Sequence, residues 1–256
     1  MTCTFRTRTI FCALLLTAAC AAGIGCGRIP GRPGPGPEVV RPEEVVDFPT
    51  LYSQNCAGCH GANGVNGAAI ALANPTYIAL AGEDRMRNVI AKGVAGKPMP
   101  PFAKSSGGML TDAQVSALAA GIVKQWSNTS ALAGETLPPY LATLPGNTDH
   151  GLQAYGAFCA RCHGASGEGG PADGKADSSR AKLGSIVDPS YLALISDQNL
   201  RSIVIAGRPD EAMPDWRGDS EHPMTDQQIT DILAWIASKR VANPGQPYGA
   251  GPHESE

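Results

Sequence analysis

The chain has 256 residues, enough for one large domain or two small ones with buried cores. Apolar residues make up 43% and charged residues 17%, a composition that excludes a largely disordered chain. The formal net charge of −3 leaves no basic footprint, so we expect no nucleic-acid partner. Four of the eight cysteines lie in the first 26 residues and four form two equally spaced pairs, which argues against a disulfide scaffold.

Residues 1–26 have the features of an export leader. Arg6 and Arg8 precede an uncharged stretch, Thr9 to Gly27, that begins with an apolar run and ends in small residues, the pattern of a secretory signal. The end of the stretch resembles a bacterial lipoprotein signal, in which a small-residue run stops at a cysteine that becomes lipidated. Cys20 and Cys26 both fit this pattern, and the sequence does not distinguish them.

An uncleaved membrane anchor is a further interpretation, because the 19 uncharged residues could just span a bilayer. Simple cleavage would leave the protein soluble in the periplasm, whereas a lipid or an anchor would hold it on the periplasmic side of a bacterial membrane. Residues 27–47, rich in Pro and Gly and then charged, have no periodic apolar face and are expected to form a semi-rigid tether.

An internal repeat organises the rest of the chain. Cys-Ala-Gly-Cys-His at 56–60 recurs as Cys-Ala-Arg-Cys-His at 159–163, an offset of 103 residues. Three later landmarks recur at an offset of 114, namely Asn74-Pro75-Thr76-Tyr77 with Asp188-Pro189-Ser190-Tyr191, Pro98-Met99-Pro100 with Ala212-Met213-Pro214, and Thr111-Asp112-Ala113-Gln114 with Thr225-Asp226-Gln227-Gln228.

The change of offset indicates an 11-residue insertion between His163 and Asp188, for which the polar run 171–179 is the natural place. We therefore predict two copies of one domain, at 48–130 and 147–242. A linker at 131–146 joins them, and a flexible tail at 243–256 follows.

Each copy is expected to be all-helical. Tyr52 and Tyr155 each lie four residues before a first cysteine, on the same helical face. Short central helices are predicted at 83–92 and 197–206. The last helices begin with capping boxes, Thr111 with Gln114 and Thr225 with Gln228. Their apolar faces are Val115, Leu118, Ala119 and Ile122 in the first copy and Ile229, Ile232, Leu233 and Ile236 in the second.

Cys-x-x-Cys-His is the attachment sequence for c-type haem. Two cysteines at i and i+3 share a helical face and can each bond one porphyrin side group, and the His that follows can ligate the iron. A thioredoxin-like redox pair and a zinc site built from all four cysteines are the alternatives. A His after each pair, and one pair in each copy, favour two haems c, held by Cys56, Cys59 and His60 and by Cys159, Cys162 and His163.

The repeat nominates a sixth iron ligand in each copy. Met99 and Met213 both lie 12 residues before the Thr of the last helix, each in a Pro-flanked turn that can hold a side chain rigidly. Thioether ligation raises the potential relative to a second His. The alternative is that both methionines pack in the core. His222 is a rival ligand, whereas Met86, Met109 and Met224 are expected in the core or on the surface.

Aligned aromatic and cationic residues could contact the haem. Phe102 and Trp216 lie three residues after each Met and are expected at the haem edge. Arg87, Arg201 and Arg208 could pair with haem propionates, although a solvated surface arginine is an equally good interpretation of each.

Together these motifs resemble the class I cytochrome c domain, twice over, across residues 48–127 and 147–242. The resemblance implies a small helical fold with crossing terminal helices and an exposed haem edge. The tandem arrangement is similar to periplasmic di-haem cytochromes c and to haem subunits of respiratory complexes such as cbb-type oxidases or alternative complex III.

The function expected from these features is single-electron transfer between redox protein partners in a respiratory or related chain, not an enzymatic reaction. The copies differ in charge, +3 for 48–130 and −4 for 147–242, which would suit a donor and an acceptor of different charge. Scattered surface charge is the simpler interpretation. A di-haem peroxidase or sulfur-compound oxidase with one open haem is the alternative function, and a mainly assembling subunit is another.

Overall fold

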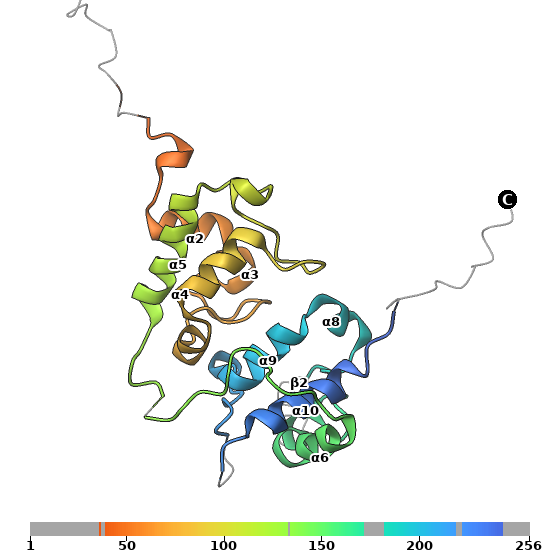
Figure 1. Ribbon diagram of the computed structural model, residues 1–256. Coiled ribbons are helices and arrows are strands. Elements are labelled where there is room, and N and C mark those ends of the chain that lie inside the picture. The colour runs from red at the N-terminus through yellow and green to blue at the C-terminus, as the bar shows by residue number, and fades with distance from the viewer. Residues whose placement is uncertain (1–35, 37–38, 133, 172–181, 219–221, 243–256) are drawn as a thin grey trace, which may run out of the picture. The chain divides into compact units, whose positions relative to one another are not determined.

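The computed structural model describes residues 36, 39–132, 134–171, 182–218 and 222–242 (Figure 1). The expected leader at 1–26 and tail at 243–256 lie outside the described residues. Of the expected tether at 27–47, the structure describes residue 36 and residues 39–47, and Pro42–Glu44 within it form a short 3-10 helix. The chain divides at Arg41, and the unit that begins at Pro42 contains both sequence repeats. None of the helices in the described part of the chain has the length and apolarity that a bilayer span requires.

The regular secondary structure of the described chain is almost entirely helical, in agreement with the predicted all-α class. The first copy contains η2 (Pro42–Glu44), α2 (Phe48–Asn55), α3 (Ala57–His60), α4 (Pro75–Lys92), η3 (Lys104–Ser106) and α5 (Asp112–Trp126). The second contains α6 (Thr148–Phe158), α7 (Ala160–His163), α8 (Pro189–Leu194), α9 (Asp197–Ala206), η4 (Pro209–Glu211) and α10 (Asp226–Ala237).

The predicted central helices are present, but the helical region of each copy begins earlier. The Asn74 and Asp188 side chains each cap a helix that has Pro at its first position. In the first copy the helix runs on to Lys92 through a kink at Gly82, where φ is +70°. In the second copy Ile195 and Ser196 separate α8 from α9, which spans the predicted 197–206. The repeated Asn/Asp-Pro pair therefore marks the start of a helix in each copy, which the sequence analysis did not predict.

The last helix of each copy follows the prediction closely. Both capping boxes form, with Thr111 paired to Gln114 and Thr225 paired to Gln228. The predicted apolar faces are buried, and Leu118 and Ile232 are each 0% exposed. Each face belongs to the hydrophobic core of its own copy.

The terminal helices of each copy pack against each other, α2 against α5 and α6 against α10 (Figure 1). A glycine lies at each of these contacts. A Cβ on Gly121 of α5 would lie 2.1 Å from Phe48 of α2, and a Cβ on Gly151 of α6 would lie 2.0 Å from the Asp231 carbonyl oxygen of α10. A larger residue at either position would therefore push the helices apart. This pairing agrees with the helix packing that the resemblance implies.

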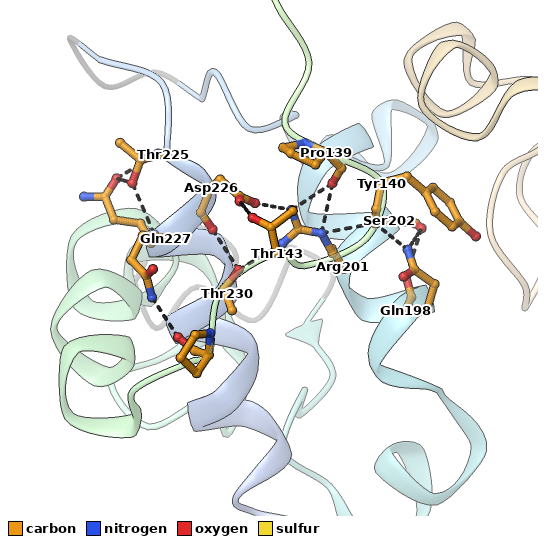
Figure 2. Close-up of polar contacts among 12 residues, drawn as sticks. Pro139, Tyr140, Thr143, Gln198, Arg201, Ser202, Thr225, Asp226, Gln227 and Thr230 are labelled. Carbon is orange, nitrogen blue, oxygen red and sulfur yellow. Dashed lines mark hydrogen bonds and ion pairs between the residues drawn. The ribbon is translucent and has the colours of Figure 1, made fainter.

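The linker is fastened to the second copy by a buried arginine, as Figure 2 shows. Arg201, which is 2% exposed, donates to the carbonyls of Pro139 and Tyr140 and to the Thr230 hydroxyl, and pairs with Asp226. These contacts connect the linker to α9 and α10.

The copies also contact each other through the start of α4. The Asn74 amide donates across the repeat boundary to the carbonyls of Ala206, at 2.9 Å, and Gly207, at 3.2 Å. Lys97 donates to the Ala193 carbonyl at 2.6 Å. Leu80 of α4 packs into the core of the second copy.

A small hairpin lies where the insertion was predicted. Two residues of β1 (Gly170–Pro171) pair antiparallel with two of β2 (Lys182–Leu183), with Gly170 opposite Leu183. Most of the polar run 171–179 lies outside the described residues.

Candidate haem-binding sites

The two Cys-x-x-Cys-His segments form the same single helical turn. In α3 the backbone N–H groups of Cys59 and His60 donate to the Cys56 carbonyl at 3.1 and 3.0 Å. In α7 the equivalent groups of Cys162 and His163 donate to the Cys159 carbonyl at the same two distances. Each turn thus carries two cysteines at i and i+3 and the His that follows on one short helix.

The four cysteines of these turns are free thiols. Burial, together with the neighbouring Cys59, raises the pKa of the Cys56 thiol to about 11. Burial and Cys162 likewise raise the pKa of Cys159 to about 12. In the part of the chain that the structure describes, which includes all four, no group of three His, Cys, Asp or Glu could hold a metal ion. The four-cysteine zinc alternative therefore finds no support, and the thiols are available for covalent attachment.

A tyrosine anchors the loop after each turn. The Tyr52 hydroxyl donates to the Gly61 carbonyl at 2.9 Å, and the Tyr155 hydroxyl donates to the Gly164 carbonyl at 2.7 Å. Both tyrosines are buried on the preceding helix. The sequence placed each Tyr on the face of its first cysteine, and the structure adds the hydrogen bond that orients the residue after His.

His60 is oriented as an iron ligand would be. Its Nδ1 lies 2.8 Å from the Ile70 carbonyl oxygen, and because a carbonyl only accepts, Nδ1 carries the proton and Nε2 keeps its lone pair. Burial lowers the pKa of His60, while the bond to Ile70 acts in the opposite direction. The neutral ring that results is the form that binds a metal.

His163 occupies the equivalent position in the second copy without an equivalent bond. Its Nδ1 is buried and has no hydrogen-bond partner among the described residues. Burial lowers the pKa of this His as well, which again favours the neutral ring.

The two candidate methionines lie in loops with the same backbone closure. The Val94 N–H donates to the Met99 carbonyl at 3.0 Å, and the Arg208 N–H donates to the Met213 carbonyl at 2.9 Å. A positive-φ glycine precedes each loop, and a Cβ on Gly93 or Gly207 would lie 2.6 Å from the backbone of the residue after Met. This aligned glycine pair was visible in the sequence but was not used as a signal.

Both loop methionines are half-buried, and Met99 packs against the core of the first copy together with Cys56 and Phe102. Trp216, three residues after Met213, is buried in the core of the second copy, against which Cys159 also packs. Among the other methionines, Met86 is buried, Met109 is 83% exposed and Met224 is half-buried against the second core.

The structure separates the three candidate partners of haem propionates. Arg201 holds the linker, as described above, and is not available for a propionate. Arg87 pairs with Glu83 and Asp84 on its own helix, at 2.6 and 2.9 Å. Arg208 pairs with Asp210 and Glu211 at 3.0 and 2.7 Å. Within the described chain the Nε atoms of Arg87 and Arg208 are buried without a partner, so both could still donate a hydrogen bond to a propionate.

His222, the rival candidate for an iron ligand, is exposed.

The residues present fit covalently attached haem. Each copy offers two free thiols at i and i+3, a neutral His on the same turn and a Met in a rigid loop. The fold and these turns define the chain as a class I c-type cytochrome with two such segments.

Comparison with known proteins narrows this class to a family. The family model described as cytochrome C oxidase, cbb3-type, subunit III matches residues 44–120 and again residues 146–236. These ranges cover more than half of the chain, and the chain belongs to this family. Its cytochrome c domains bind haem c covalently and support haem-based electron transfer.

A search of curated proteins finds no match to the chain. Among solved structures, the chain is similar to a chain of the Kuenenia stuttgartiensis reducing HAO-like protein complex, with 17% identity over 80% of this chain and 99% of that one. The TM-score is 0.40, which is too low for this likeness to bear on function.

Proposed function

We propose that the chain is a di-haem c-type cytochrome that carries single electrons on the outer face of a bacterial cytoplasmic membrane. The observation that carries this proposal is the repetition of one complete ligand set. The first copy supplies Cys56, Cys59, His60 and Met99, and the second supplies Cys159, Cys162, His163 and Met213. A metal or redox site that occurred once would not need both.

The residues of each copy have separate tasks. The cysteine pair would bond the porphyrin, and the His beside it would ligate the iron from the same turn. Haem c supplies a one-electron Fe(III)/Fe(II) couple when bound. The loop methionine would close the sixth position, and its thioether favours the reduced metal. The buried tyrosine holds the loop after His, which keeps the ligating ring close to its cysteines.

Redox proteins are the partners that this function requires. The family name points to a haem subunit of a terminal oxidase, and the proposal includes both a free carrier and such a subunit. The basic first copy and the acidic second copy favour donor and acceptor surfaces of opposite charge. The proposed location rests on the leader-like sequence at 1–26, with a lipid on Cys20 or Cys26, or the uncleaved segment, as anchor.

Replacing each loop methionine tests the proposal. Met99→Ala and Met213→Ala should each open one iron, so that half of the ferric Met–iron absorption band is lost and one haem per chain binds carbon monoxide. The potential of that haem should fall while the other stays nearly unchanged. Met109→Ala is the matched control, because this Met is 83% exposed and should leave the spectrum unaltered.

The outcomes separate the candidate functions. If neither loop substitution changes the spectrum, the methionines are not ligands. If the unmodified protein already binds carbon monoxide at one haem, that iron is open, and a peroxidase or oxidase reaction replaces electron carriage as the function to test.

A further inference from the structure

The two axial histidines differ in one contact. The His60 Nδ1–H donates to the Ile70 carbonyl at 2.8 Å, in a site where the ring is 9% exposed. The equivalent atom of His163 is buried and unpartnered in the described part of the chain. The two copies are alike in their tyrosine hydrogen bonds, cysteine turns and methionine loops. The contact of the His Nδ1 is therefore a difference between sites that otherwise correspond.

The loop that follows each His explains the difference. Both loops open with the same turn, since the Gly64 N–H donates to Gly61 and the Gly167 N–H donates to Gly164. Both also close on the equivalent glycine carbonyl, with a bond from Ala73 to Gly64 at 3.0 Å and a bond from Ile186, one residue before the position that corresponds to Ala73, to Gly167 at 2.9 Å.

Between these shared bonds the two chains take different courses. The first loop passes through residues 65–72, which include the Ile70 carbonyl that His60 uses. The second passes through residues 168–185, of which the structure describes 168–171 and 182–185, and in these Gly170 pairs with Leu183 in the β1–β2 hairpin. The described part of the second loop thus offers His163 no carbonyl in place of the Ile70 carbonyl that serves His60.

A hydrogen bond from the outer nitrogen changes what a ligating His does. It fixes the tautomer and the ring orientation, and it makes the ligand more basic. A more basic ligand stabilises the oxidised metal, so the bond lowers the reduction potential. His60 has this bond, and among the described residues His163 has no equivalent one.

We propose that the two haem sites have different reduction potentials because only one His has this hydrogen bond among the described residues. His60 is an oriented, electron-rich ligand and His163 a weaker and less restrained one, so the site in the second copy has the higher potential and holds the electron at equilibrium. This inference rests on the proposed function, since it requires a haem in each copy.

Surface charge acts in the opposite direction and must be separated from the ligand effect. The second copy carries a net charge of −4 and the first +3, which by itself would favour oxidised iron in the second. Interactions between exposed charges are largely screened in concentrated salt, because the Debye length falls to about 3 Å at 1 M. The potentials should therefore be compared at high ionic strength.

A loop graft tests the inference in the full-length, haem-loaded protein. The variant has residues 168–185 replaced by a copy of residues 65–72, and the shared closing bonds mark both ends of the graft. In the unaltered protein, a redox titration in 1 M salt should show that the electron occupies the second site about tenfold more often than the first, which is the usual contribution of one hydrogen bond. That ratio equals about 59 mV for a one-electron couple.

The graft should bring the second potential down towards the first and leave the first unchanged. The reciprocal variant, with residues 168–185 in place of 65–72, should raise the first potential and leave the second unchanged. A second measurement needs no variant. In the NMR spectrum of the unaltered protein, the hydrogen-bonded ring N–H of His60 should exchange with solvent more slowly than the ring N–H of His163.

The inference is overturned if the two potentials coincide in 1 M salt, if the first is the higher, or if both ring N–H groups are equally protected. In each of these cases two haems with closed iron sites would leave the proposed function intact. A protein that binds fewer than two haems would contradict the proposed function itself.

Discussion

The two copies share the backbone and side-chain contacts that hold their candidate haem ligands, and they differ in what surrounds one candidate ligand, the His. Each has a tyrosine bonded to the glycine after His, a capping box on the last helix and a glycine before the methionine loop. Among the described residues, the outer His nitrogen donates to a carbonyl in the first copy and has no partner in the second, where the β1–β2 hairpin follows the His. We propose that this difference gives the two sites different reduction potentials although their candidate ligands correspond.

The largest effect should come from removing one attachment pair. Cys56→Ser with Cys59→Ser should leave one haem per chain, held by the second copy, and Cys159→Ser with Cys162→Ser should leave the other. The ratio of haem absorbance to protein, together with the mass of the intact chain, measures this directly. Two covalent haems in either double variant would show that attachment lies elsewhere.

Core truncation should show whether the copies depend equally on their last helices. Leu118→Ala and Ile232→Ala each remove a side chain that is 0% exposed, and each should cost about 2–5 kcal/mol of unfolding free energy. Leu194→Ala is the control, because this leucine is 59% exposed and should change stability by about 0.5 kcal/mol or less. Denaturant titration followed by circular dichroism measures the unfolding free energy of all three variants. If the control lost as much stability as the core variants, Leu118 and Ile232 would not be the core residues on which the two copies depend.

Asn74 and Asp188 cap equivalent helices but differ in their second task. Asn74→Asp should keep the cap and lose both amide donors to Ala206 and Gly207, at a cost of about 1–3 kcal/mol for the unpaired buried carbonyls. Asp188→Asn should be nearly neutral, since that side chain is exposed. Equal effects in the same denaturant titration would mean that the contact between copies contributes nothing to stability.

The smallest effects should come from the capping boxes. Thr111→Ala and Thr225→Ala should each cost about 1 kcal/mol, because each removes one N-cap acceptor. Gln114→Ala should cost more than Gln228→Ala, since Gln114 also donates to the carbonyls of Pro42 and Val45. Thermal unfolding of the four variants ranks them, and equal losses for the two glutamines would contradict this difference between the copies.

Much of the fold was predictable because local signals and the repeat agreed. The capping boxes at Thr111 and Thr225 and the apolar faces behind them fixed the last helices. Tyr52 and Tyr155 were placed on the correct face, but their bonds to Gly61 and Gly164 depend on how the next loop folds back.

The remainder depends on contacts distant in sequence, which spacing does not reveal. Arg201 aligns with Arg87, yet it meets the linker carbonyl of Pro139, while Arg87 meets carboxylates on its own helix. The difference in hydrogen bonding between His60 and His163 could not be predicted from the sequence, because it depends on how the loop after each His runs. Alignment within the repeat therefore predicted which residues correspond, but not which partners they find.

One measurement tests the central claim most directly, namely the optical spectrum of the purified protein, oxidised and reduced, before and after addition of carbon monoxide. Two closed His/Met sites predict two covalent haems per chain, both low-spin, with the ferric Met–iron band present and no shift on adding carbon monoxide. A high-spin component, or carbon monoxide binding at either haem, would contradict that account and identify an iron open to substrate.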